Sequence, residues 1–523
     1  MAGGSILGTR VERKEDPKFL TTGGVYVDDL DEELLAGAAH VAYARSAVAH
    51  GTITSIDVEG AKEMPGVIGV FTAADLELQP VPSQFNPTVA RTLLASDKVR
   101  FVGEPVVAVV AETLAQATDA AEMVFVDVDF LPAHVDIEGS LASDSLIYDA
   151  AGSNGVFDTT AIGMPDNTPA EEYFADCEVT ATGRFLNQRV APCPLEVRGS
   201  AATWVDGRLF QWLSTQHAQG VKVPIAAANG VDDDVVRVIA PDVGGAFGAK
   251  IGTYAEEMLL GVLAKAIGRP VRWRETRSES MMAMGHGRGQ LQYATIGGTR
   301  DGRVTHFQLH LLQDCGAFAD VGTVLPMAFG RPMAAGVYDI ANIEVRATSV
   351  VTNTTPTVPY RGAGRPEATA AVERAMDIFA AEVGLDPADV RRINLIPKFM
   401  DKHTTSIGQT YDVGAYEESL DKALEAAGYA ELRAEQAARR ESNADKQLGI
   451  GVSVYVEITG GVDPMGEAAK IEVNDDGSAT VYTGTSPHGQ GHDTSWSMIA
   501  SDQTGIPMDR ITLVWGDTDL VPA

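Results

Sequence analysis

The stretch from residue 235 to residue 275 constrains the fold of this chain more than any other. Val235–Ala240 has the apolar pattern of a strand, Pro241–Lys250 is a glycine-rich loop, and Thr253–Ile267 has the periodicity of an amphipathic helix. Val271–Glu275 then has the pattern of a second strand. This order of strand, loop, helix and strand predicts an α/β layer.

The glycine-rich loop precedes a helix, where free backbone N–H groups can hold an anion or a dinucleotide. Its spacing differs from the G-x-G-x-x-G dinucleotide fingerprint, which disfavours a nicotinamide-dependent dehydrogenase. Ile251, and not Ser or Thr, follows Lys250, so the loop is no phosphate loop either. A tight turn packed close to a sheet explains the glycines equally well.

Two further regions of regular structure flank this unit. Residues 33–132 alternate short apolar strands with a helix, which predicts a small α/β unit. Its expected elements are strands at Val67–Phe71, Pro105–Ala111 and Val124–Phe130, and a helix at Thr113–Met123. Residues 138–170 lack periodicity and are expected to form a linker.

The region after residue 359 again mixes helices and strands. Its expected elements are helices at 367–383 and Ala415–Ala438, and strands at Gly449–Glu457, Ala468–Val473 and Ala479–Thr483. A chain of 523 residues is too long for one hydrophobic core. The expected fold class is therefore a multidomain α+β or α/β protein.

The charge pattern excludes some partners. The net charge of −32 repels phosphate backbones and anionic lipids, so neither nucleic acid nor a membrane surface is an expected partner. From Phe101 to Gly183 there is no Lys or Arg, which fits either a solvated face or a docking face for a basic subunit. We expect this stretch to lie at least partly on a subunit contact.

Targeting and redox signals point to a cytoplasmic protein. Met1–Arg10 has no apolar core behind a basic start, so no signal peptide is expected, and no apolar run is long enough to span a bilayer. The three cysteines Cys177, Cys193 and Cys315 are widely spaced and form no CxxC, so this chain is not expected to hold an iron–sulfur cluster.

Two more small-residue loops carry candidate chemistry. In TVPYRGAGRPE at residues 357–367, Arg361 or Arg365 can offer donors to an oxyanion, although a basic helix cap explains them equally well. GTSPHGQGHDT at residues 484–494 has the composition of a backbone-lined phosphate or pterin site. Glycines between His488 and His492 oppose a shared helix face, so no zinc site is expected.

Taken together and in this order, the motifs resemble one family, the xanthine oxidase-type molybdenum hydroxylases, in the branch of the carbon monoxide dehydrogenase-like large subunits of form II type. The resemblance covers essentially the whole chain. It rests on GTRVERKEDP at 8–17, GGVYVDD at 23–29, VGEPV at 102–106, APCPLEVRG at 191–199, and the three loops.

The resemblance implies a domain order and a set of partners. It implies an α/β hammerhead domain over residues 1–140, a linker at 141–170, a first molybdenum-cofactor-binding domain over 171–410 and the start of a second over 411–523. It further implies a molybdenum–molybdopterin cytosine dinucleotide in this chain, with iron–sulfur clusters and FAD on a small and a medium subunit. The expected assembly is a dimer of heterotrimers.

The resemblance also implies a function. It is the oxidation of an aldehyde or N-heterocycle with oxygen from water, with electrons leaving through the iron–sulfur and FAD subunits. Site roles are implied for residues that match the family's motifs. Gln216, Phe247 and Arg361 are expected at the reacting centre, and the protein itself provides no direct metal ligand. The expected cofactor-binding set is Gln216, Gly245, Phe247, Gly248, Arg361, Gly362, Ala363, Gly489, Gln490 and Gly491.

Three departures from the family pattern bear on the expected substrate and activity. Gly362 stands where the carbon monoxide oxidisers have a copper-binding cysteine, which puts CO oxidation in doubt. Ile251 stands where purine oxidisers have a glutamate. The family's base glutamate lies in a Gly-Glu motif far toward the C-terminus, and no carboxylate up to Ala523 sits in a motif that matches it, so we expect a C-terminally truncated chain that is inactive alone. The alternative function is a catalytically silent, truncated or split subunit that acts as a scaffold for cofactor and partners.

Overall fold

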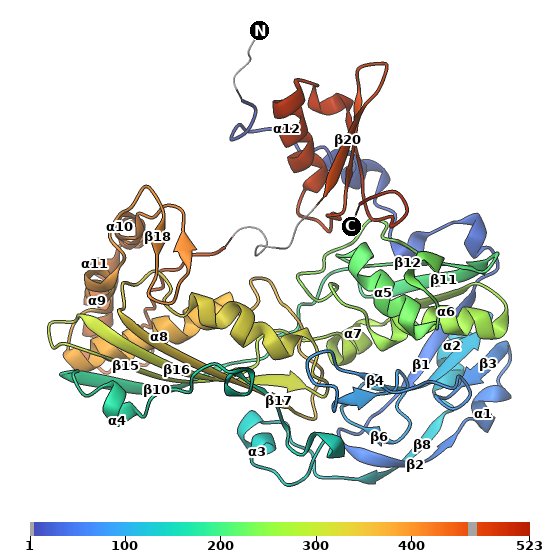
Figure 1. Ribbon diagram of the computed structural model, residues 1–523, viewed down its shortest axis with the longest axis horizontal. Coiled ribbons are helices and arrows are strands. Elements are labelled where there is room, and N and C mark those ends of the chain that lie inside the picture. Colours follow the sequence, from blue (N-terminus) through green and yellow to red (C-terminus); the bar gives the residue numbers. More distant parts are fainter. Residues whose placement is uncertain (1–4, 459–467, 523) are drawn as a thin grey trace.

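The computed structural model describes residues 5–458 and 468–522. Figure 1 shows two large sheets side by side, with a smaller sheet and helix α12 above them. Strands from residues 39–111 and strands from residues 199–274 share one of the two large sheets, and the hydrophobic cores lie between each large sheet and its helices. No helix among the described residues is long and apolar enough to cross a membrane.

A seven-stranded sheet has the order β13-β12-β11-β14-β1-β7-β3. Its strands are β1 (Ala39–Arg45), β3 (Val67–Phe71), β7 (Pro105–Ala111), β11 (Gly199–Val205), β12 (Arg208–Leu213), β13 (Val236–Ile239) and β14 (Val271–Arg274). Its helices are α1 (Glu59–Lys62), α2 (Leu114–Ala121), α5 (Ala218–Ala228), α6 (Ala255–Ile267) and α7 (Arg277–Ala283).

The predicted strand–loop–helix–strand unit is present, but its strands are not neighbours. β11 and β12 lie between β13 and β14, so α6 carries the chain across them. The expected small α/β unit is not separate either, because β1 pairs in parallel with β14, with Ala39 opposite Val271. One hydrophobic core therefore serves both units.

A second small sheet completes the N-terminal region. It contains β2 (Gly51–Asp57), β6 (Lys98–Val99) and β8 (Phe125–Phe130), and a hairpin of β4 (Val81–Pro82) and β5 (Ala90–Arg91) lies nearby. β8 is an edge strand on which Phe125 and Phe130 are 60% and 79% exposed, beside Asp127 and Asp129. The stretch without Lys or Arg, residues 101–183, begins before β7 and runs through β8 and the following helices into the next sheet.

The other large sheet has five strands in the order β10-β15-β16-β17-β9. Its strands are β9 (Gly155–Asp158), β10 (Val179–Asn187), β15 (Gln290–Gly298), β16 (Val304–Gly316) and β17 (Asn342–Val351). Its helices are α3 (Ile137–Leu141), α4 (Ala170–Tyr173), α8 (Arg365–Val383) and α9 (Pro387–Asn394). α8 packs along one face of the sheet, and Ala371, Ala375 and Phe379 are fully buried there.

Residues 138–170 are more ordered than the expected linker. β9 pairs antiparallel with β17 at the edge of the five-stranded sheet, and α3 packs against β17. The strand is only four residues long, so it has too few alternations to show a pattern in the sequence. Its partner strand supplies the order.

The predicted helix at Ala415–Ala438 consists of two helices. α10 (Tyr416–Ala427) ends and α11 (Tyr429–Glu441) begins at Gly428, whose φ of 63° is left-handed and ends the first helix. A hairpin of β18 (His403–Thr404) and β19 (Thr410–Tyr411) precedes them.

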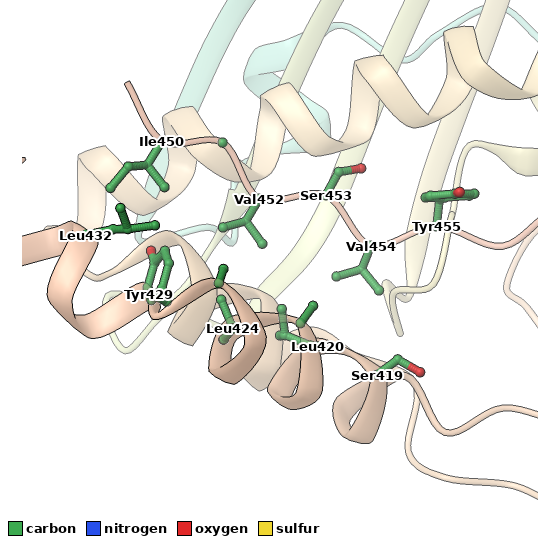
Figure 2. Close-up of a pocket in the computed structure, with 13 residues that line it drawn as sticks. Ser419, Leu420, Leu424, Tyr429, Leu432, Ile450, Val452, Ser453, Val454 and Tyr455 are labelled. Atoms are coloured by element: carbon green, nitrogen blue, oxygen red, sulfur yellow. The ribbon is translucent and has the colours of Figure 1, made fainter. Parts of the chain in front are cut away.

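The predicted strand at Gly449–Glu457 has the alternation of a strand but no sheet partner among the described residues. Val452, Val454 and Val456 pack against the core, whereas Ser453 and Tyr455 are exposed. A groove of about 430 Å³ separates this segment from α10 and α11. Figure 2 shows Val452 and Val454 pointing toward Leu420 and Leu424 across it. Alternation of apolar and polar residues indicates only that one face of a segment is buried. A hydrogen-bonded ladder needs a second strand as well.

The last described sheet follows residue 468. β20 (Ala469–Val473) and β21 (Ala479–Thr483) form the predicted hairpin, β22 (Ile511–Val514) pairs in parallel with β21, and α12 (His492–Thr504) covers the sheet. This part docks on the edge strand β13, where Ala240 N–H donates to Gly516 O at 2.7 Å. Arg237 of β13 also pairs with Asp517.

Candidate cofactor-binding site

The three glycine-rich loops meet at one cavity of about 1260 Å³. Nine of the ten predicted cofactor-binding residues line it: Gln216, Gly245, Phe247, Gly248, Arg361, Gly362, Ala363, Gly489 and Gln490. The tenth, Gly491, is the left-handed N-cap residue of α12 and does not line the cavity. Residues more than 200 positions apart in the sequence are thus brought together.

The first loop is held in a strained conformation. Phe247 has a φ of 56°, which a residue with a Cβ rarely adopts, and Gly248 has a φ of 100°. A Cβ on Gly248 would lie 2.5 Å from the carbonyl oxygen of Pro359, so only glycine lets the first loop approach the second. Gln216 Oε1 accepts from Gly248 N–H at 2.8 Å, which ties the loop to the end of β12.

A buried ion pair anchors the same loop. Lys250 Nζ lies 3.0 Å from Glu196 Oε2 and donates to Ser214 Oγ at 2.9 Å, and its side chain is 1% exposed. Glu196 also accepts from Gly244 N–H at 2.7 Å. Burial lowers the pKa of Lys250, and the Glu196 carboxylate opposes this effect. Glu196 therefore braces the loop, and Lys250 does not line the cavity.

Hydrogen bonds from two other segments hold the backbone of the second loop. Arg361 N–H donates to Phe247 O at 2.8 Å, and Arg288 donates to Arg361 O at 2.8 Å. Within residues 5–458 and 468–522, the Arg361 guanidinium has no hydrogen-bond or ion-pair partner, although it lines the cavity. Glu367 caps the start of α8 by accepting from Gly364 N–H at 2.8 Å. The loop thus presents one unpaired cation to the cavity.

The third loop carries donors and open backbone. Gln490 Oε1 accepts from His488 N–H at 2.6 Å, and the His488 ring lies 3.3 Å from Gln216 Nε2. The left-handed Gly489 has no atom within 4 Å of the position a Cβ would take, so open space adjoins its backbone. Ser486 Oγ is buried without a partner in the part of the chain that the structure describes.

The two histidines of this loop do not share a helix, as predicted. His488 precedes α12 and His492 is its first residue, with ring centroids 6.4 Å apart. No group of three or more His, Cys, Asp or Glu side chains in the described ranges could hold a metal ion.

The N-terminal segment, which motif reasoning did not place, orients the third loop. Glu15 accepts from both the backbone N–H and the hydroxyl of Thr494 in the first turn of α12. Lys14 Nζ lies 3.4 Å from Asp493 and donates to Ser497 Oγ at 3.0 Å. A signal was present, because GTRVERKEDP was one of the family-like motifs, but its position beside α12 depends on contacts across some 480 residues.

The donor set of this cavity fits an organic cofactor that carries its own metal ligands. Backbone at Gly245 and Gly489, the amide of Gln216 and the guanidinium of Arg361 offer hydrogen-bond donors with little bulk. Ile251 lies at the edge of the cavity at the position where purine oxidisers carry a glutamate, so the wall is apolar there.

Comparisons with known proteins agree with this geometry. Residues 21–132 match the aldehyde oxidase and xanthine dehydrogenase a/b hammerhead domain, and residues 148–395 and 422–523 match two molybdopterin cofactor-binding domains. The nicotine 6-hydroxylase large subunit of Paenarthrobacter nicotinovorans is 34% identical over 97% of this chain. The carbon monoxide dehydrogenase large chain of Afipia carboxidovorans is 33% identical over 99%.

A solved structure shows the same fold. Quinoline 2-oxidoreductase from Pseudomonas putida 86 superimposes with a TM-score of 0.89 at 33% identity, over 98% of this chain and 66% of that one. The chain spans 64% of the nicotine hydroxylase subunit and 67% of the carbon monoxide dehydrogenase chain. Motifs, cavity and fold agree, and the chain belongs to the molybdopterin-binding large subunits of the xanthine oxidase family.

Proposed function

We propose that this chain is the large subunit of a molybdenum hydroxylase that oxidises an N-heterocycle or an aldehyde with oxygen from water. One observation carries the proposal: three loops from distant parts of the chain meet at one cavity and present to it Arg361, whose guanidinium has no partner among the described residues. The names of the relatives support the substrate class, since one hydroxylates nicotine and another oxidises quinoline.

The chain's own residues divide the work of binding and orientation. The bound molybdenum–pterin group, proposed in its cytosine dinucleotide form, would supply the two-electron oxidation. Gly245, Gly489 and Gln490 would hold the cofactor by backbone and amide donors, and Gln216 would direct its Nε2 toward the metal end. Phe247, Ile251 and Leu195 are apolar residues that line the cavity, which suits an uncharged planar substrate.

Arg361 is the candidate for charge stabilisation. Its guanidinium offers planar donors, and negative charge that develops on a substrate oxygen or nitrogen during oxidation would be stabilised there. Because its backbone is held by Phe247 and Arg288, the point from which its side chain extends is fixed before substrate arrives. The departures at Gly362 and Ile251 argue against CO and against purines.

Partners belong to the same proposal. We propose an iron–sulfur subunit and an FAD subunit, in a cytoplasmic dimer of heterotrimers. The cysteines Cys177, Cys193 and Cys315 are free and too few for an iron–sulfur cluster, so electrons would leave through another chain. The edge strand β8, with exposed Phe125 and Phe130 beside Asp127 and Asp129, is the part of the stretch without Lys or Arg that best suits a subunit contact.

The proposal is tested on the complex purified with its co-purifying chains. We expect molybdenum and a pterin in proportion to this chain, and oxidation of quinoline or nicotine that incorporates ¹⁸O from labelled water. A complex that carries molybdenum but oxidises no N-heterocycle and no aldehyde would favour the alternative, a cofactor-binding scaffold without turnover.

The same preparation is expected to contain no copper in proportion to molybdenum. Soft sulfur ligands select Cu(I), and Gly362 offers none at the position where the carbon monoxide oxidisers have a cysteine. Elemental analysis and CO-dependent dye reduction measure this directly. Equal copper and molybdenum together with CO oxidation would contradict the substrate class proposed above.

A further inference from the structure

Arg288 holds the backbone of the second loop and was not singled out by any motif. It donates to the carbonyl oxygens of Tyr360 and Arg361, the latter at 2.8 Å. Its guanidinium lies 4.8 Å from the centroid of the Tyr360 ring and 3.6 Å from Glu367. The side chain is 12% exposed and does not line the cavity. Arg288 therefore contacts the second loop without lining the cavity.

Local backbone structure forces this approach. The segment before β15 runs against residues 356–358, where His286 N–H donates to Pro356 O at 3.1 Å and Val358 N–H to His286 O at 2.8 Å. A Cβ on Gly287 would lie 2.2 Å from the Tyr360 Cβ, so glycine is required for the contact. Arg288 itself has a left-handed φ of 63°, which is strained for a residue with a Cβ.

The backbone of Arg361 is thus held at both its N–H and its carbonyl oxygen. Phe247 O accepts its N–H at 2.8 Å on the side of the first loop, and Arg288 holds its carbonyl on the other side. The positive charge of Arg288 is offset by the buried Glu367, whose second role is to cap α8 at Gly364. The guanidinium of Arg361 is left free to face the cavity.

We propose that Arg288 is a positioning residue that aims Arg361 at the reacting group, an inference that rests on the function proposed above. A planar fork with two parallel N–H donors can hold two successive carbonyls, which an ammonium group cannot match in geometry. Without the fork, the loop gains freedom at residues 360–362, and the Arg361 donors lose their preset place. Misplacement by about 1 Å costs on the order of a hundredfold in rate.

The test is a double-mutant cycle in the purified complex. We expect Arg288→Ala to lower kcat about ten- to a hundredfold, with KM and molybdenum content nearly unchanged, and Arg288→Lys to recover little of the loss. In an Arg361→Ala background, the same Arg288→Ala change is expected to lower kcat less than about threefold, because its effect passes through Arg361. Equal losses in both backgrounds would overturn the proposal.

A matched control separates positioning from folding. Arg189 donates to the Thr355 carbonyl and to Thr354 Oγ1 of the same connection, before the loop begins. Arg189→Ala is expected to lower thermal stability and to leave kcat per molybdenum within about twofold. A loss of kcat equal to that of Arg288→Ala would mean that any loosening of this connection suffices, which contradicts the specific role of Arg288.

Hydrogen exchange provides a readout independent of turnover. Arg288→Ala, or Arg288→Lys if the alanine variant does not fold, is expected to speed amide exchange in residues 360–363 and to leave exchange in α8 unchanged. Unchanged exchange in this loop would overturn the proposal. If the complex oxidises no heterocycle or aldehyde, the proposed function fails, but the exchange comparison still decides whether Arg288 holds the loop.

Discussion

Arg361→Ala is expected to lower kcat about a hundredfold or more while molybdenum content stays near that of the unchanged complex. The Arg361 guanidinium lines the cavity without a partner in the described ranges, so its donors are available for charge that develops during the reaction. Loss of one preorganised donor of this kind typically costs on the order of a hundred- to a thousandfold in kcat. Steady-state kinetics of heterocycle oxidation, normalised to molybdenum, measure the effect.

Arg365→Ala is the matched control, because it removes the other arginine of the same loop. Arg365 is paired with Glu457 at 3.0 Å and stacks on Phe329, and it does not line the cavity. We expect a loss of less than about tenfold in kcat from this change. If Arg361→Ala instead loses its cofactor but keeps normal turnover per molybdenum, Arg361 is structural and its assignment is wrong.

The second large effect is expected on stability, from Arg198→Met. Arg198 is fully buried and pairs with Glu275 at 2.7 Å and Glu256 at 3.3 Å. Removing the cation leaves two buried carboxylates with too little compensation, which costs roughly 3–5 kcal/mol. Burial by itself raises the pKa of Glu256, but Arg198 and Arg45 outweigh this and lower it to about 2. The carboxylate is therefore charged at neutral pH and depends on its arginines.

Arg198 also contacts a tyrosine that holds the first loop of the cavity. The Arg198 guanidinium lies 4.0 Å from the Tyr254 ring centroid, and Tyr254 Oη donates to Ala249 O in the first loop at 2.6 Å.

Urea unfolding followed by circular dichroism measures the change in free energy of unfolding. Arg303→Met is the control, because Arg303 is 39% exposed in its pair with Asp339 and should cost within about 1 kcal/mol. Equal losses for the two variants would contradict the buried-pair explanation.

Local pattern determined much of this protein. Val67–Phe71 and Pro105–Ala111 are strands with the predicted bounds, and the helix predicted at Thr113–Met123 is present as α2 (Leu114–Ala121). Short-range periodicity and capping residues decide such elements, and Thr113 does cap α2 by accepting from Gln116 N–H. The three glycine-rich loops could also be found in sequence, because small residues in a fixed order are visible without knowing what lies opposite them.

Tertiary structure decided everything that depends on a second segment. The strand predicted at residues 449–457 was wrong: the segment alternates as a strand does, yet it forms no ladder with any described residue, since pairing needs a partner that a single segment cannot reveal. β9 gains its order from β17, and β1 joins β14 across more than 200 residues. In the same way, Arg361 is recognisable by its motif, but its backbone is held by Phe247 O and by the Arg288 side chain, which are distant in the sequence. Local sequence specifies which groups are present, and only the packing of distant segments sets where they lie. The reason is that a hydrogen bond forms only when donor and acceptor atoms come within about 3 Å of each other, which for these groups requires the folded chain.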